Sequence, residues 1–288
     1  MKQCIICLKN KEIQEFSEEH IFPKALGGTL KIYNCCKKCN ELMGGLVDDR
    51  LNNLKFTEIV RFLLKIKGRS GVPNPFNELM ETPYDGVHGH LKINKKGEFK
   101  GFEVKTKPVV NTKNHFVVVG DSKNPKEILN AIKNKVKKYN QKPFTEQELV
   151  ENIKAFLLGL VDSINIGINS ELEIEYLEHI SPAILKIAFE LAWKYLGQEY
   201  LNDTTGNEIR TVLYDITEGK TDIIIPTDIS FDNLDWNNIK RYHSARIITE
   251  NNYIVCYLNI LNFIKGKVII SEQAENYNQL NELIELNF

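Results

Sequence analysis

Two Cys-x-x-Cys pairs near the N-terminus limit the fold of this chain more than any other feature of its sequence. Cys4 and Cys7 form the first pair, and Cys36 and Cys39 form the second. A C-x-x-C turn brings two thiolates within reach of one ion at about 2.3 Å, and two such turns complete a tetrahedral zinc site. Cys35 leaves an alternative open, because it can replace Cys36 in a C-x3-C pair. Four cysteine ligands leave no open position, so we predict a structural zinc that does not itself activate water.

The distribution of cysteine also indicates the cellular compartment. Five of the six cysteines lie within the first 39 residues, and closely paired thiols in a reducing cytosol bind metal more often than they form disulfides. Cys256 lies alone in the apolar run YIVCYLNIL and is predicted to be a buried small hydrophobe. The start, MKQCIICLKN, lacks the apolar stretch of about 7–15 residues that a signal peptide needs. We therefore expect a cytoplasmic protein.

The charge balance excludes one class of nucleic-acid-binding protein. The formal net charge of −1 is not that of a protein that coats nucleic acid through global positive charge. Any contact with DNA must come from a local patch. Lys24, Lys31, Lys37 and Lys38 lie close in sequence to the cysteine pairs and can meet phosphates. The alternative, a solvated basic face, is equally compatible with the sequence.

The remainder of the chain predicts a mixture of helices and antiparallel strands. Apolar residues at spacings of three or four indicate an amphipathic helix over residues 47–67. Residues 84–120 alternate as a small antiparallel sheet with a turn at Lys96-Gly97, and residues 240–272 are typical of a strand meander. Further helices are expected at residues 124–139, 145–162 and 182–196. We predict an α+β protein with an N-terminal module of residues 1–68 and a larger mixed domain of residues 80–288.

The interval between the cysteine pairs holds polar residues suited to chemistry. Glu19 and His20 stand in the run S-E-E-H-I-F-P-K, Asn34 follows later, and Asn40 comes directly after the last cysteine of the motif. A histidine beside carboxylates offers a base whose pKa lies near neutrality and a hard oxygen ligand for a cation such as Mg²⁺. The two asparagines add polar side chains to the same small module.

The order of these motifs resembles a known family. C-x-x-C, then E-H-I-x-P, L-G-G, N and finally C-x-x-C-N is similar to the zinc-bearing branch of the HNH endonucleases, which have the ββα-metal fold. The resemblance implies that His20 is the general base and that Asn34 orients it. It also implies that Glu19 and Asn40 bind a catalytic divalent cation. Asn40 stands where histidine is frequent in the family, a variation that the family tolerates.

This resemblance implies a metal-dependent endonuclease that hydrolyses phosphodiester bonds of DNA with Mg²⁺ or Mn²⁺. Such modules occur in restriction, mobile-element and phage-defence enzymes, and residues 80–288 are then expected to supply target choice, regulation through a ligand or partner, or self-association.

Several alternatives stay open from the sequence alone. Glu18 competes with Glu19 as a cation ligand, Asn34 can be an ordinary turn residue, and Asn40 can cap a helix that begins near Glu41. The competing function is a non-catalytic zinc ribbon that binds nucleic acid or another protein.

Overall fold

The computed structural model describes residues 1–76, 80–81, 88–96, 98–105, 107–111, 116–119, 125–138, 172–220, 230–231 and 238–288. The chain divides into two compact units, which are described separately. The first unit combines Met1–Pro73 with Asn169–Phe288, and the second consists of Asn74–Ile168. The predicted division into domains of residues 1–68 and 80–288 stays a prediction.

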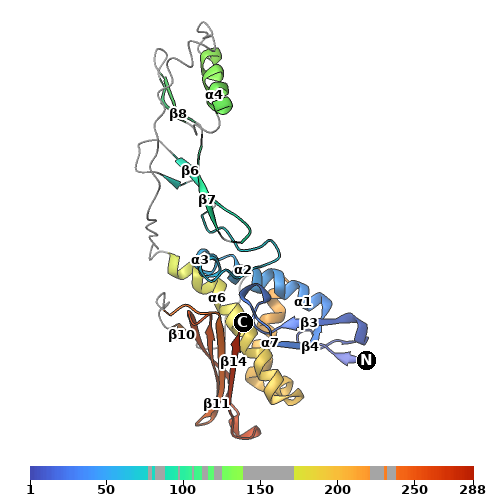
Figure 1. The fold of residues 1–288 in the computed structure, drawn as a ribbon. Helices are drawn as coiled ribbons and strands as arrows, with labels where there is room; N and C mark the ends of the chain where they lie inside the picture. The colour runs from blue at the N-terminus through green and yellow to red at the C-terminus, as the bar shows by residue number, and fades with distance from the viewer. Residues whose placement is uncertain are drawn as a thin grey trace. The chain divides into compact units, whose positions relative to one another are not determined.

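The first unit begins with two short hairpins and a helix (Figure 1). β1 (Lys2–Gln3) pairs with β2 (Asn10–Lys11), and the turn between them carries the first cysteine pair. β3 (Phe16–His20) pairs with β4 (Lys31–Cys36), and α1 (Lys37–Met43) follows β4 directly. This strand, strand, helix order is the one that the resemblance implies.

The helical region after α1 is less regular than the sequence predicts. A π-helical turn, η3 (Gly44–Asp48), leads into α2 (Asp49–Asn52), and α3 (Lys55–Leu63) follows. The single helix expected over residues 47–67 is thus interrupted at Leu54, whose backbone is extended (φ −60°, ψ 136°). The apolar periodicity located the buried face correctly, because Leu51, Leu54 and Ile59 are all buried.

Helix α6 (Leu172–Leu196) forms the centre of the first unit. It contacts η3 and α2 of the N-terminal part, and also strands of the C-terminal sheet. The predicted start at residue 182 is wrong: α6 begins at Leu172 and Pro182 lies inside it. A proline removes one backbone donor from a helix, but here the helix continues through residues that the core buries completely, including Ala183, Ile184 and Leu185. The predicted end is confirmed by Gly197, which has a φ of 82°.

The C-terminal sheet of the first unit has the strand order β10-β13-β12-β11-β14. Its strands are β10 (Ser230–Phe231), β11 (Tyr242–Glu250), β12 (Tyr253–Ile260), β13 (Ile264–Ser271) and β14 (Asn281–Asn287). The antiparallel pairing of β11, β12 and β13 confirms the predicted meander, and Asn251 in its first turn has the positive φ of 53° that such a turn requires. The sequence did not predict β14 or the helix α7 (Thr204–Thr217). The short η4 (Gln198–Asn202) connects α6 to α7.

The second unit confirms the predicted antiparallel strands. β6 (His88–Ile93) pairs with β7 (Phe99–Val104) and with the short β5 (Met80–Glu81), and β8 (Lys107–Asn111) pairs with β9 (Phe116–Val119). The predicted helix near residues 124–139 is α4 (Pro125–Lys138). Gly97 and the helix expected at residues 145–162 lie outside the described residues. The predicted α+β class is confirmed, and no helix within the described ranges is long and apolar enough to span a bilayer.

A buried histidine joins the loop after β3 to the C-terminal strands. The His243 ring stacks on Phe22 and on Phe288, with ring centroids 4.8 and 4.9 Å apart. Its Nε2 lies 3.1 Å from the Leu26 carbonyl oxygen, and its Nδ1 accepts from the Leu261 N–H at 3.2 Å. A neutral ring that donates from Nε2 satisfies both contacts. Burial accordingly lowers the pKa of His243 to about 4.

This histidine should make the first unit sensitive to acid. Because the folded-state pKa is lower than the ordinary value of about 6.5, the unfolded chain binds more protons, and stability is lost as pH falls from about 6.5 to about 4. The full effect is about 3 kcal/mol. Urea unfolding of the wild type at pH 7.5 and pH 5 should show about 2 kcal/mol of this loss, because pH 5 lies above the folded-state pKa. His243→Phe should be less stable at pH 7.5 but lose less on acidification, and an equal loss in both proteins would contradict the assignment.

Candidate functional site

The two cysteine pairs form one cluster. The sulfur atoms of Cys4, Cys7, Cys36 and Cys39 all lie within 4.8 Å of one another. Four sulfurs around zinc at the usual bond length lie about 3.8 Å apart, so a small contraction of the cluster fits the ion. Three of the four residues are buried, and Cys7 is partly exposed. The predicted metal-binding cluster is therefore confirmed, and a donor set of four thiolates suits zinc.

Local backbone structure holds the cluster together. The Leu8 N–H donates to the Cys4 carbonyl at 2.9 Å and closes the first turn, while Cys36 and Cys39 stand at the end of β4 and in the first turn of α1. The Cys36 N–H also points at the Cys4 sulfur at 3.4 Å. Cys35 is buried but does not belong to the cluster, which settles the choice between the two spacings. A metal ion here would join the N-terminal turn to the start of α1.

His20 stands at the end of β3, directly paired with Lys31 of β4. Its Nε2 lies 3.5 Å from Glu18 Oε1, and Lys31 Nζ binds the same carboxylate at 2.8 Å. The imidazole remains 14% exposed, so that solvent or a substrate can reach it. Burial, with help from nearby lysine charges, lowers the pKa of His20 despite the opposing charge of Glu18. The neutral, basic form of the ring is therefore favoured at physiological pH.

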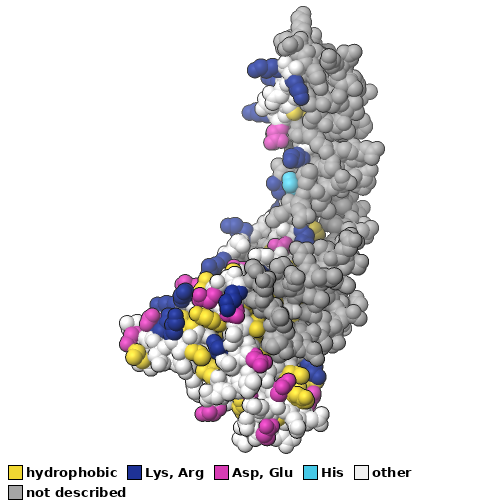
Figure 2. All heavy atoms as spheres, turned by 180° about the vertical axis from the view of Figure 1, so that it is seen from behind, with side chains coloured by type: hydrophobic (Ala, Val, Ile, Leu, Met, Phe, Trp, Pro, Cys, Tyr) yellow, Lys and Arg dark blue, Asp and Glu magenta, His cyan; other side chains and the backbone are white. Residues whose placement is uncertain are grey.

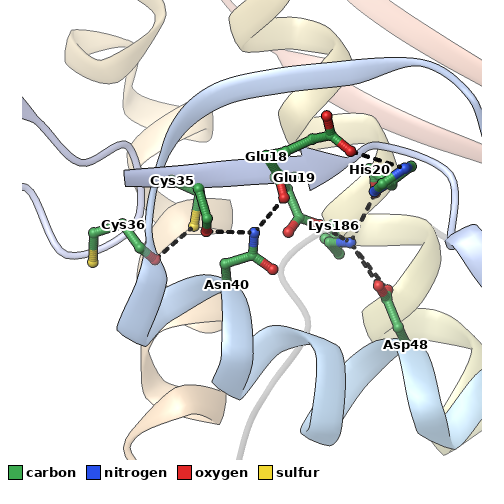
Figure 3. A network of polar contacts seen from close by, with 9 residues as sticks. Glu18, Glu19, His20, Cys35, Cys36, Asn40, Asp48 and Lys186 are labelled. Carbon is green, nitrogen blue, oxygen red and sulfur yellow. Dashed lines mark hydrogen bonds and ion pairs between the residues drawn. The ribbon is translucent and has the colours of Figure 1, made fainter. Parts of the chain in front are cut away.

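Glu19 points to the opposite side of β3, into the protein. Its carboxylate binds the ammonium of Lys186 from α6 at 2.5 Å, and Asp48 of η3 binds the same ammonium at 2.9 Å. Burial raises the pKa of Glu19, and the Lys186 charge opposes that rise. Of the two candidate carboxylates, Glu18 thus lies beside the imidazole, whereas Glu19 lies in a buried ion pair (Figure 3).

Asn40 lies in α1 on the same side of β3 as Ser17. Its side-chain NH₂ donates to Ser17 Oγ at 3.0 Å and to the Glu18 carbonyl at 2.8 Å. These two bonds use both amide donors and leave Oδ1 as a free acceptor among the contacts of the described residues. The alternative that Asn40 caps a helix is wrong, because α1 begins at Lys37 and its N-cap is Cys36.

Asn34 lies on β4, where the register places Lys31 rather than Asn34 opposite His20. Its backbone carbonyl accepts from the Ile5 N–H at 3.0 Å, which ties β4 to the first cysteine turn. No contact between the Asn34 side chain and His20 occurs in the described part of the chain. Its role in orienting His20 stays a prediction.

Charged side chains of both signs cover the face shown in Figure 2, without a continuous basic surface over the described residues in that view. Around the site, Lys24, Lys37 and Lys38 are exposed, whereas Lys31 is engaged by Glu18. Three of the four predicted phosphate-binding lysines are thus available for charge contacts.

Comparison with known proteins assigns the class of the N-terminal module. Residues 4–56 match the model of a family described as HNH endonuclease. The resemblance inferred from the motif order is confirmed for this segment, and it indicates nuclease activity at the level of the domain. The matched segment is a minor part of the 288-residue chain. Neither the curated proteins nor the solved structures contain a match.

Two residues that contact this site, Asp48 and Lys186, were not predicted from the sequence. Lys186 is fully buried, and Glu190 follows it one helical turn later in the same apolar helix. A lysine and a glutamate four residues apart on the core face of a helix are costly unless they are partnered. That pattern predicts a buried ion pair on this helix, but the sequence alone does not identify the partner residues.

Loss of the thiolate cluster should unfold the module. Binding of structural zinc typically contributes about 10–16 kcal/mol to the free energy of folding. Cys36→Ser should therefore lose the metal and lower the midpoint temperature of thermal unfolding. Metal content is measured by mass spectrometry of the purified full-length chain. Cys35→Ala is the matched control and should retain about one zinc per chain; loss of zinc in that variant, or its retention in Cys36→Ser, would contradict the assignment.

Proposed function

We propose that the N-terminal module is a metal-dependent endonuclease that hydrolyses phosphodiester bonds of DNA. The single observation that carries this proposal is the partly exposed imidazole of His20, whose neutral form is favoured, within a segment that matches the HNH endonucleases. Hydrolysis needs an activated water, stabilisation of charge on the phosphoryl oxygens and help for the leaving oxygen.

In this proposal His20 activates the attacking water. Glu18 Oε1 lies 3.5 Å from Nε2 and would favour a proton on that nitrogen, which leaves Nδ1 as the basic nitrogen that takes a proton from water. Asn34 is retained as a candidate for orienting the ring, and Lys31 holds Glu18 in position from the neighbouring strand. General-base catalysis of this kind typically contributes about 10²–10⁴-fold.

Glu19 and Asn40 are the proposed ligands of a Mg²⁺ or Mn²⁺ ion. Hard cations prefer oxygen donors, and the site offers the Glu19 carboxylate and the Asn40 Oδ1, whose amide donors are already used. When bound, such a cation stabilises negative charge on the phosphate and on the leaving oxygen. Exposed Lys24, Lys37 and Lys38 would contact neighbouring phosphates.

Residues 80–288 would supply target choice, regulation or self-association, and a role in restriction or phage defence is part of the same proposal. The competing function is a zinc ribbon that binds without cleaving. That function gives no reason for a partly exposed histidine beside the Glu18 carboxylate.

The proposal predicts that His20→Ala abolishes cleavage without loss of the fold. Supercoiled plasmid is incubated with the full-length protein and Mg²⁺ or Mn²⁺, and nicked and linear products are measured. The variant should lose at least 10²-fold in rate, because only the general base is removed. His90→Ala, in β6 of the second unit, is the matched control and should cleave normally.

Two results would count against this function. Intact plasmid with the wild type under all metal conditions would favour the binding alternative. Cleavage by His20→Ala at more than a tenth of the wild-type rate would remove His20 from its proposed role.

A further inference from the structure

Helix α6 carries a lysine into the interior of the nuclease module. Lys186 has no exposed side-chain surface, and its neighbours on the helix, Leu185 and Ile187, are equally buried in the core. A buried ammonium is tolerated only when its three donors are satisfied and its charge is balanced. The partners of Lys186 therefore indicate its purpose.

Those partners all belong to the N-terminal module. Lys186 Nζ lies 2.5 Å from Glu19 Oε1, 2.9 and 3.0 Å from the two Asp48 oxygens, and 3.3 Å from the His20 carbonyl oxygen. One ammonium thus contacts the proposed cation ligand and the backbone of the proposed general base. Burial alone would lower the pKa of Lys186, but the charges of Asp48, Glu190 and Glu19 outweigh it and raise that pKa well above its usual value.

The Lys186 ammonium fixes the position of the Glu19 carboxylate. In Figure 3 the Glu19 carboxylate lies between the Lys186 ammonium and the Asn40 carboxamide. One carboxylate oxygen, Oε1, is bound by Lys186, which leaves the other for a cation. Asn40 is fixed by Ser17 Oγ and by the carbonyl oxygen of Glu18, the residue directly before Glu19. The two proposed ligands are thereby held at neighbouring positions along β3, Asn40 against the Glu18 carbonyl and Glu19 against Lys186.

We propose that Lys186, braced by Asp48, is a positioning residue that orients the Glu19 carboxylate for the catalytic cation and fixes the end of β3 that carries His20. This inference rests on the proposed function and extends it to a residue outside the segment that matches the HNH endonucleases. Groups that orient metal ligands in this way typically change metal affinity or activity by about 10–100-fold.

The test measures Mn²⁺ binding and cleavage separately, with the full-length zinc-loaded protein. Free Mn²⁺ is followed by electron paramagnetic resonance for the wild type, Lys186→Met, Glu19→Gln and the double variant. Lys186→Met should weaken Mn²⁺ binding about 10–100-fold and reduce kcat with little change in the KM for DNA. The double variant should bind Mn²⁺ no more weakly than Glu19→Gln alone, because both changes act on Mn²⁺ binding through the same carboxylate. Lys194→Met, at an exposed position of the same helix, is the matched control and should match the wild type.

Three outcomes would overturn the inference. The first is unchanged Mn²⁺ affinity in Lys186→Met, and the second is additive losses of Mn²⁺ affinity in the double variant. The third is tighter Mn²⁺ binding by Lys186→Met, which would show that the ammonium competes with the cation. If the wild type binds Mn²⁺ through Glu19 but cleaves no DNA, the proposed function fails while the binding measurements still decide the role of Lys186. If the wild type cleaves and Lys186→Met cleaves and binds equally well, only the inference fails.

Lys186→Met leaves two carboxylates without their counter-ion and can fail to fold. Asp48→Asn then serves as the deciding variant, because it keeps the contact between Lys186 and Glu19 and weakens the brace by removing the Asp48 charge and one of its two acceptor oxygens. It should retain zinc and circular dichroism and bind Mn²⁺ several-fold more weakly than the wild type. Unchanged Mn²⁺ affinity in that folded variant would overturn the inference.

Discussion

Four thiol groups within one small cluster determine where the other groups of the site can lie. The cluster joins the turn at residues 4–7 to the end of β4 and the first turn of α1. Because β4 pairs with β3, the same tie places the end of β3, with His20, beside α1, with Asn40. A metal bound by these thiols would take no direct part in the proposed chemistry, yet the positions of His20 and Asn40 would depend on it.

The module also depends on elements far away in sequence. Ile21 and Phe22, which follow His20, are completely buried, and His243 stacks on Phe22 from the C-terminal sheet. From the other side, Lys186 of α6 reaches Glu19 and the carbonyl of His20. The residues that match the HNH endonucleases thus share one core with α6 and the C-terminal strands. The proposed nuclease site would therefore be sensitive to changes in parts of the chain that the family match does not cover.

Local signals in the sequence were sufficient for the cysteine cluster, the strand meander and the end of α6. Each of these depends on short-range chemistry: thiol spacing, alternation of apolar residues, or a glycine with positive φ at residue 197. The start of α6, the break at Leu54 and the strand β14 depend on packing between distant segments, and periodicity alone did not predict them. The partnership of Lys186 with Glu19 and Asp48 is of the same kind, since it joins residues more than a hundred positions apart.

Central to the proposed function are two separate metal sites: a structural ion in the thiolate cluster, and a second cation that we propose binds at Glu19 and Asn40. Crystals of the zinc-loaded protein soaked in Mn²⁺ test this proposal most directly through anomalous difference maps on either side of the zinc and manganese absorption edges. The account predicts a zinc peak among the four sulfurs and a manganese peak at the Glu19 and Asn40 oxygens. Manganese bound elsewhere, or a thiolate cluster without zinc, would contradict it.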